Sequence, residues 1–334
     1  MLLERSERPV TVLDIQRMST EDGPGLRTTL FMKGCSLRCD WCHNPESIDS
    51  RPLIQWNSHR CIGCDSCREV CESGSLVWIQ NQAEGQIKID GNSCNLCQAC
   101  VECCPSGALH LKGKQWEREE LLKELLKDRA YFGREGGITL SGGEPLLQAE
   151  AALWLLENIR REGLKTALDT AGLVQTEVLL AALEQTDLLL YDLKIFNSEE
   201  HRKYTGSGNE QILANLVATL AKAGQSGTKV WIRTPLVPGV TDGAENIAGL
   251  ARWLATFGTE QIERWELCAF NNLCENKYLM LDCDWPYQGV KPQTGVELDR
   301  LVEVAFANLS GNGMLVQWTG SAALEKNQEG GEAR

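Results

Sequence analysis

The sequence lacks three features that would place the protein in a membrane, outside the cell or on a nucleic acid. Hydrophobic residues make up 43% of its 334 residues, yet no apolar run reaches the length of about 18 that a transmembrane helix needs. The N-terminus carries charged residues too early to form the apolar core of a signal peptide. Acidic residues outnumber basic ones by 46 to 33, and no basic stripe typical of nucleic-acid binding is present. We therefore expect a cytoplasmic protein with neither a membrane nor a nucleic acid as partner.

Cysteine is the residue that the sequence has in excess. Twelve of its 15 cysteines lie between Cys35 and Cys104, at short and repeated spacings. In a chain of this length with no visible export signal, such spacings indicate metal ligands in a reducing compartment rather than disulfides.

The first cysteine motif, "GCSLRCDWCHNP" at residues 34–45, supplies three thiols, Cys35, Cys39 and Cys42. A structural zinc site takes four protein ligands, and so does an iron–sulfur cluster that only carries electrons. Three cysteines leave one iron of a [4Fe–4S] cluster without a protein ligand, as catalytic metal sites do. The motif therefore predicts a cluster with an open coordination site.

A longer cysteine motif occurs twice, at residues 61–76 and 94–109. Each copy reads C-x2-C-x2-C-x3-C before a small-residue turn and a leucine, which is the ligand run of bacterial ferredoxins. Paired zinc knuckles are the alternative, but they would need histidine or a longer gap between ligand pairs. We expect an inserted ferredoxin-like domain at residues 52–114 with two more [4Fe–4S] clusters. Because the fourth cysteine of each run serves the other cluster in such ferredoxins, the expected ligand sets are Cys61, Cys64, Cys67 and Cys104, and Cys94, Cys97, Cys100 and Cys71.

Strand-like and helix-like runs alternate around this insert. Strands are expected at residues 27–34, 137–143, 165–172, 187–194, 229–236 and 262–270, with a short one at 314–318. Helices are expected at residues 116–133, 145–163, 176–185, about 209–223, 244–257 and 295–309. This alternation predicts right-handed βαβ units in a parallel α/β sheet. Six strands are too few for a closed eight-stranded barrel, so we expect a partial, laterally open (β/α)6 barrel. Its parts would be residues 1–51 and 115–320, followed by a polar tail at 321–334.

The motifs resemble those of one enzyme family. C-x3-C-x-aromatic-C, with Trp41 as the aromatic residue, resembles the signature of radical S-adenosyl-L-methionine (SAM) enzymes. The sequence is similar to the glycyl radical enzyme activating enzymes in particular, and to their branch with a two-cluster ferredoxin insert. The similarity covers residues 10–318 and rests on five segments in the family's order: "EDGPGLRTTLFMKGCSLRCDWCHNPES" (21–47), "GGITLSGGEPLLQ" (136–148), "LDTAG" (168–172), "YDLK" (191–194) and "WIRTPLVPGVTD" (231–242).

The resemblance implies a radical SAM barrel and a defined activity. The open iron would bind the amino and carboxylate groups of SAM, and one electron would cleave it to methionine and a 5′-deoxyadenosyl radical. That radical would remove hydrogen from a glycine of a large glycyl radical enzyme, met in a transient complex. The implied cofactors are three [4Fe–4S] clusters and SAM, and the implied reductant is a low-potential electron donor such as flavodoxin or ferredoxin.

The resemblance also implies contacts with SAM near the cysteine loop. Trp41 and His43 would lie against the adenine, the alternative for either being a side chain that only packs the loop. Gly142 and Gly143 would let the backbone approach the ligand, and either Glu144 or that backbone would hold the methionine ammonium. The alternative for Glu144 is an acidic residue that starts a helix.

Charged residues at the ends of neighbouring strands complete the candidate site. Asp192 and Lys194 share a strand face, and together with Asp169 they suit a ligand that carries both charges, although an internal ion pair is the alternative. Arg233 could bind a carboxylate or a ribose, or form a salt bridge at the barrel rim. Asn271 stands where relatives often have histidine, so a hydrogen-bonding role survives there and an acid–base role does not.

Two other functions remain open. A pure electron carrier would explain the insert but not the three-thiolate motif. Another radical SAM enzyme, acting on a peptide, an RNA or a small molecule, would usually carry its extra clusters after the barrel rather than within it. The sequence does not identify which glycyl radical enzyme would be the partner.

Overall fold

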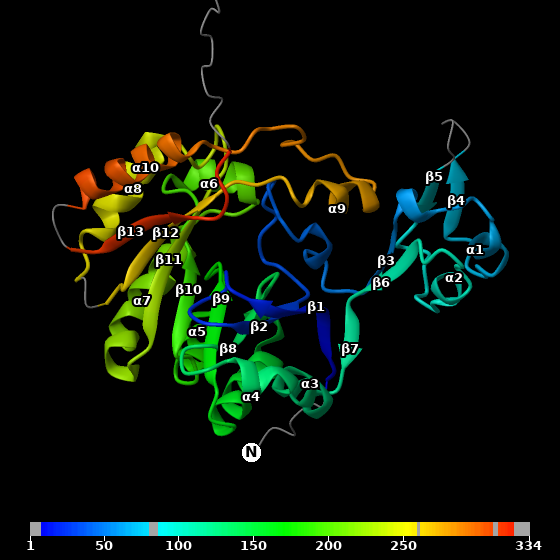
Figure 1. The fold of residues 1–334 in the computed structure, drawn as a ribbon, viewed down its shortest axis with the longest axis horizontal. Coiled ribbons are helices and arrows are strands. Elements are labelled where there is room, and N and C mark those ends of the chain that lie inside the picture. The colour runs from blue at the N-terminus through cyan, green and yellow to red at the C-terminus, as the bar shows by residue number, and fades with distance from the viewer. Residues whose placement is uncertain (1–7, 80–85, 259–260, 310–312, 324–334) are drawn as a thin grey trace, which may run out of the picture.

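The computed structural model describes residues 8–79, 86–258, 261–309 and 313–323, and its largest element is a nine-stranded sheet (Figure 1). Seven neighbouring strands run parallel, namely β2 (Arg27–Met32), β8 (Gly137–Gly142), β9 (Lys165–Thr170), β10 (Leu188–Asp192), β11 (Lys229–Leu236), β12 (Arg264–Ala269) and β13 (Leu315–Thr319). β1 (Val10–Ser19) lies antiparallel to β2, and β7 (Lys114–Trp116) lies antiparallel to β1. The sheet is open, because β13 and β7 stand at opposite ends of the strand order.

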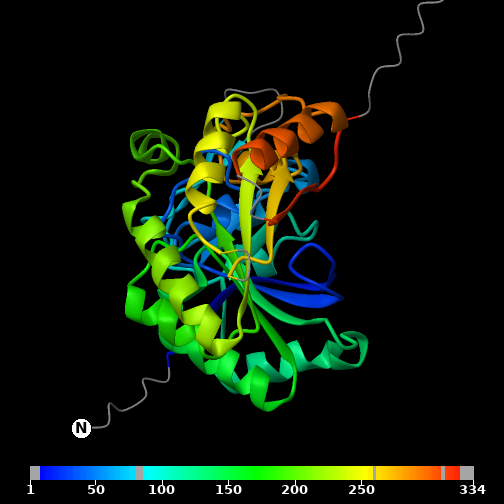
Figure 2. The ribbon, with the colours of Figure 1, turned by 90° about the vertical axis from the view of Figure 1, so that its left-hand side faces the viewer.

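Helices follow most of the parallel strands and form an outer layer around them (Figures 1 and 2). This layer comprises α3 (Arg118–Leu125), α4 (Ala149–Arg161), α5 (Thr176–Leu183), α7 (Glu210–Ser226), α8 (Ala244–Leu254) and α10 (Gly295–Asn308). α4 shows why such a helix packs there: Ala152, Leu155, Leu156 and Ile159 are all buried at helical spacing, which gives the helix one apolar stripe. The strands are apolar on both faces, as parallel strands covered by helices usually are. Two other helices, α6 (Ser198–Thr205) and α9 (Glu275–Met280), lie outside this layer.

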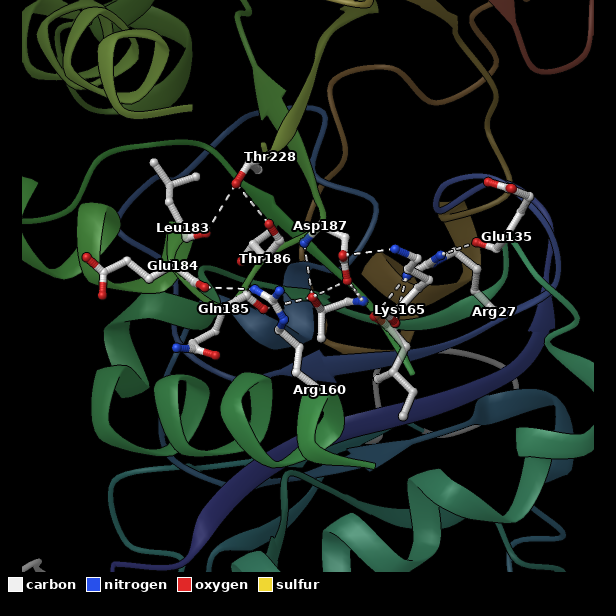
Figure 3. A network of polar contacts seen from close by, with 12 residues as sticks. Arg27, Glu135, Arg160, Lys165, Leu183, Glu184, Gln185, Thr186, Asp187 and Thr228 are labelled. Carbon is white, nitrogen blue, oxygen red and sulfur yellow. Dashed lines mark hydrogen bonds and ion pairs between the residues drawn. The ribbon is translucent and has the colours of Figure 1, made fainter. Parts of the chain in front are cut away.

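A polar network closes the end of the sheet where the parallel strands begin (Figure 3). Arg27 is only 1% exposed, and its guanidinium donates to the carbonyls of Ile138 at 3.0 Å and Glu135 at 3.3 Å. Nearby, Lys165 at the start of β9 donates to the Asp187 carboxylate at 3.1 Å. Burial lowers the pKa of Arg27 to about 10, although neighbouring carboxylates oppose the shift. These polar groups form hydrogen bonds with one another. We therefore look for a functional site at the opposite end of the sheet, where the parallel strands finish.

The residues between β2 and β7 include two small antiparallel sheets. β3 (Leu53–Trp56) pairs with β6 (Leu109–Lys112), and β4 (Leu76–Ile79) pairs with β5 (Gln86–Ile89). Two four-residue helices, α1 (Ser66–Glu69) and α2 (Ala99–Glu102), complete the unit. It has its own core of apolar side chains and cysteines, separate from that of the large sheet. In Figure 1 it projects to one side and joins the large sheet through β7.

Several expected boundaries are wrong. The helix expected at residues 116–133 begins later, because the backbone of Lys114–Trp116 pairs with the edge of β1 as β7. The rest of the expected helix is divided into α3 and a 3₁₀ helix at Leu126–Tyr131. β1 itself and α6 were not expected. The first turn expected for the helix at 145–163 is a 3₁₀ helix over Pro145–Gln148.

Two other expectations concern the chain end and membranes. Most of the polar tail expected at residues 321–334 lies outside the described residues. Among the helices in the described ranges, none is long and apolar enough to cross a membrane.

Candidate active site

The three-cysteine loop leaves the carboxyl end of β2 and is held first by the turn that follows it. The Gly34 amide donates to the Ser47 carbonyl at 2.7 Å, and the Cys35 amide donates to the Ile48 carbonyl at 3.2 Å. The Cys42 amide donates back to the Cys39 carbonyl at 3.1 Å, which closes a turn between two of the thiols. The loop conformation is therefore fixed by backbone bonds.

Two distant segments hold the same loop from outside. The Arg38 amide donates to the Thr205 carbonyl at the end of α6, at 2.8 Å. From α9, the Tyr278 hydroxyl donates to the Cys42 carbonyl at 2.9 Å. The neighbouring ammonium of Lys277 lies 2.6 Å from Asn44 Oδ1 and 3.0 Å from Glu46 Oε1, just after the loop. The loop is thus clamped between residues far apart in the sequence.

The three thiols of this loop lie close enough to influence one another. Burial raises the pKa of Cys35, and it raises those of Cys39 and Cys42 to about 12. The charge of Cys35 adds to the upward shifts at Cys39 and Cys42, that of Cys39 adds to the shift at Cys42, and Lys194 opposes all three shifts. All fifteen cysteines of the chain are free thiols. Partly buried free thiols close to one another are suited to a metal centre, whose binding displaces their protons.

The glycine pair at the end of β8, Gly142 and Gly143, approaches protein backbone closely. A Cβ on Gly142 would lie 2.3 Å from the Met32 nitrogen, and one on Gly143 would lie 2.1 Å from the Gly34 carbonyl oxygen. The amides of Gly143 and Glu144 donate to the carbonyls of Met32 and Gly34 at 2.9 and 2.7 Å. The pair thereby packs the end of β8 against the start of the cysteine loop.

Glu144 is completely buried, and its carboxylate caps the 3₁₀ helix that follows it. It accepts from the Leu146 amide at 3.2 Å, the Ala171 amide at 3.0 Å and the Thr170 hydroxyl at 2.8 Å. Burial raises its pKa to about 7, although these three donors oppose the shift. The side chain thus serves as the helix-start acid considered from the sequence.

The structure brings together the four charged residues expected at the strand ends. Lys194 and Asp192 form an ion pair, with side chains 10% and 25% exposed. Arg233 on β11 lies 3.9 Å from Asp169 on β9, and it lies 3.8 Å from Glu266 on β12. Asp169 also accepts from the Ser141 hydroxyl at 2.7 Å. Burial raises the pKa of Asp169, and Arg233 opposes that shift.

The aromatic and amide residues of the candidate site lie on the same side as α9. Trp41 is buried in a cluster with Phe270, Tyr278, Trp285 and Tyr287, against which Cys39 packs. The exposed His43 hydrogen-bonds the backbone of Asn271, whose own Oδ1 accepts from Leu273 at 3.2 Å.

The eight cysteines expected as auxiliary ligands line two similar hollows in the insert. Hollow A is lined by four of them: Cys61, Cys64, Cys67 and Cys104. Hollow B is lined by the other four: Cys71, Cys94, Cys97 and Cys100. Each hollow draws its fourth cysteine from the other run. No group of three or more His, Cys, Asp or Glu in the described residues has the geometry for a single metal ion, but a [4Fe–4S] cluster spreads its thiolates over several irons.

Three residues of this region were missed by sequence reasoning. Tyr278 and Lys277 hold the cysteine loop from α9, and Glu266 pairs with Arg233. No spacing in the sequence signals these contacts, since each joins segments that only the fold brings together.

Two protein families and a solved structure are similar to this chain. Residues 89–251 match the Radical SAM superfamily, and residues 60–108 match a 4Fe-4S dicluster domain. A radical SAM methyltransferase from Sphaerobacter thermophilus has a similar fold, with a TM-score of 0.53 and 13% identity, over 93% of this chain and 77% of that one.

Three curated relatives are each named as an activating enzyme. The (2S)-3-sulfopropanediol dehydratase activating enzyme of Klebsiella oxytoca is 36% identical, over 85% of this chain and 89% of its own. The choline trimethylamine-lyase activating enzyme of Oleidesulfovibrio alaskensis is 36% identical, over 88% and 94%. The benzylsuccinate synthase activating enzyme of Thauera aromatica is 37% identical, over 83% of each chain.

Proposed function

Because the chain belongs to the glycyl radical enzyme activating enzymes of the radical SAM superfamily, we propose which of its residues carry out the family's reaction. The enzyme cleaves SAM reductively and removes a hydrogen atom from a glycine of a partner glycyl radical enzyme. The observation that carries the residue assignment is the loop in which three partly buried thiols lie close together, held on three sides.

Cys35, Cys39 and Cys42 are the ligands of the catalytic [4Fe–4S] cluster. When bound, the cluster supplies one electron to the sulfonium of SAM, which yields methionine and the 5′-deoxyadenosyl radical. Three thiolates and no fourth protein ligand leave one iron free for SAM, by the same logic as at catalytic zinc sites. Lys194 contributes a positive charge beside the thiolates, which favours their ionised form.

The backbone of Gly142 and Gly143 is the better candidate for holding the methionine ammonium. An ammonium is a donor only, so it needs acceptors. The Glu144 carboxylate already accepts three hydrogen bonds from the protein, which supports a positioning role for that side chain and leaves the ligand to the neighbouring carbonyls.

The charged pairs and the α9 side of the pocket bind the rest of SAM. Asp192, Lys194, Asp169 and Arg233 offer both signs of charge at the strand ends, which suits the amino-acid and ribose groups. Trp41, His43 and Asn271 bind the adenine side, with Asn271 acting through hydrogen bonds alone. The proximity of His43 to the Asn271 backbone supports this grouping.

The insert, between Pro52 and Lys114, is an electron relay with two auxiliary [4Fe–4S] clusters. Hollow A provides Cys61, Cys64, Cys67 and Cys104, and hollow B provides Cys71, Cys94, Cys97 and Cys100. Each donor set is all thiol, which fits Cys₄ ligation of an iron–sulfur cluster. A low-potential donor such as flavodoxin or ferredoxin would deliver the electrons, in a cytoplasm that keeps the 15 thiols reduced.

The partner is met in a transient complex. The open sheet leaves the strand ends accessible to a glycine loop of another protein, which must leave its own core to enter. Ordering such a loop costs free energy, so the two proteins are expected to bind more weakly than the area buried between them would otherwise predict.

An assay without any partner tests the residue assignment. The anaerobically reconstituted chain, reduced in the presence of SAM, is expected to form 5′-deoxyadenosine, whereas Cys39→Ala is expected to form none. A Cys283→Ala variant is the control, because Cys283 is exposed and lies outside all three ligand sets. Deoxyadenosine formation by Cys39→Ala at the parent rate would contradict the assignment.

A further inference from the structure

One indole in the insert has a buried N–H group with no acceptor in the described residues. Trp56 is the last residue of β3, its side chain lies in the insert core, and the residue is only 8% exposed. Its Nε1 is inaccessible to solvent and unpaired in the described part of the chain. Buried indole N–H groups usually find a partner, because leaving one unpaired loses its hydration without a compensating hydrogen bond. This N–H therefore requires an acceptor from something other than the described side chains.

Trp56 lines hollow A together with that hollow's four cysteines. Most of the other lining side chains offer no acceptor, since Ile87, Ala108 and Leu109 are apolar. The Asp65 carboxylate, which also lines the hollow, is paired with Arg68 at 2.9 Å. Sulfur atoms of an iron–sulfur cluster accept hydrogen bonds, and such bonds help to set its reduction potential.

Hollow B lacks this donor although the same strand lines it. Ile54 stands two residues before Trp56, so both side chains point to one face of β3, and Ile54 lines hollow B. β5 contributes in the same way, with Ile87 to hollow A and Ile89 to hollow B. The two hollows are thus lined alike by two strands, and they differ at β3 by one indole N–H.

We propose that Trp56 Nε1–H donates a hydrogen bond to a sulfur of the cluster in hollow A and raises the reduction potential of that cluster. The proposal rests on the function proposed above, which puts a cluster in this hollow. Reduction adds one electron and no proton, so the negative charge on the sulfur atoms increases. A fixed N–H donor stabilises that charge more in the reduced state than in the oxidised state, because hydrogen bonds to charged acceptors are the stronger ones. Trp56 is therefore a positioning and tuning residue, not a catalytic one.

The first test is an anaerobic redox titration of the full reconstituted chain, followed by electron paramagnetic resonance. Trp56→Phe removes the N–H and keeps an aromatic ring. We expect the potential of one auxiliary cluster to fall by about 59 mV, which corresponds to a tenfold change in its reduced-to-oxidised ratio. Trp78→Phe is the matched control, because Trp78 lines the same hollow but is partly exposed, and it should leave the potential unchanged. Equal potentials in the parent and Trp56→Phe would overturn the proposal.

A second measurement keeps the proposal testable if Trp56→Phe fails to assemble. Trp56 and Trp78 are the two tryptophans of residues 52–114, so Trp78→Phe leaves one indole in the insert. In a Cys39→Ala, Trp78→Phe chain labelled with ¹⁵N-indole tryptophan, electron–nuclear double resonance should detect nitrogen coupled to a reduced cluster. No coupling would overturn the proposal.

Iron and sulfide analysis of the same samples distinguishes a failure of the role proposed for Trp56 from a failure of the proposed electron relay. Two clusters in the insert with no ¹⁵N coupling and no shift in potential would contradict the role of Trp56 alone. An insert that binds no cluster in hollow A would contradict the proposed relay itself, and the role of Trp56 with it.

Discussion

Replacing Lys194 with methionine is expected to destabilise the fold strongly, because it leaves a carboxylate without its partner inside the sheet. Lys194 is 10% exposed and pairs with Asp192, which is 25% exposed. Breaking a buried ion pair by removing one partner costs about 3–5 kcal/mol. Since Asp192 retains some contact with solvent, we expect the lower end, about 3 kcal/mol. That is a large part of the roughly 5–15 kcal/mol by which folded domains are stable.

The free energy of unfolding of the apo chain, measured anaerobically in urea, tests this value. Lys222→Met is the matched control, because Lys222 pairs with Glu184 at 3.0 Å while their side chains are 34% and 58% exposed. Such surface pairs contribute about 0–1 kcal/mol. An Asp192→Asn, Lys194→Met double variant completes a mutant cycle, and the two changes should be clearly non-additive. The reasoning is refuted if Lys194→Met costs no more than Lys222→Met, or if the cycle is additive.

The pH dependence of this effect follows from the direction of one shift. Burial lowers the pKa of Lys194, but the Asp192 carboxylate, the Cys39 thiolate and Asp169 outweigh that, so its pKa is raised above 10.5. A raised lysine pKa contributes stability that is fully present below the unfolded value and is lost only as pH rises through the folded one. The difference between the parent and Lys194→Met should therefore stay constant from about pH 6 to pH 9.

Three further predictions concern the clusters and their loop. Anaerobic analysis should give about 12 iron atoms per chain, from three clusters with three, four and four cysteine ligands, and a value near four would contradict the two auxiliary clusters. Cys97→Ala should still cleave SAM when the catalytic cluster is photoreduced directly, and a folded variant that fails under those conditions would refute the relay role. Tyr278→Phe removes the hydroxyl that donates to Cys42 and should lower the free energy of unfolding in urea by about 1 kcal/mol. Leu279→Ala, at a side chain 53% exposed, is its control, and equal stability of the two variants would show that the bond contributes nothing.

The features that the sequence could predict depend on spacing along the chain. Strand β11 occupies the expected residues 229–236, because a buried apolar run between a glycine turn and a proline-rich loop marks both ends. The α/β alternation and the family were predicted from ordered motifs in the same way. The eleven cysteine ligands remain a prediction.

The features that could not be predicted depend on contacts between distant segments. β7 is only three residues long, and it forms a strand because its backbone pairs with the edge of β1. Tyr278 lies 236 residues from the carbonyl that it holds. The role of Glu144 was open from the sequence, because its neighbours Thr170 and Ala171 come from another strand end.

The most direct test of the account is an electron paramagnetic resonance spectrum of the enzyme with a candidate partner. The reduced chain, SAM and a glycyl radical enzyme encoded beside it are mixed anaerobically, and complex formation is measured with and without SAM. The account predicts a glycyl doublet on the partner, split by its remaining α-hydrogen, and a transient complex that SAM tightens. Deoxyadenosine formation without a radical on any adjacent candidate would contradict it and favour a radical enzyme that acts on another substrate.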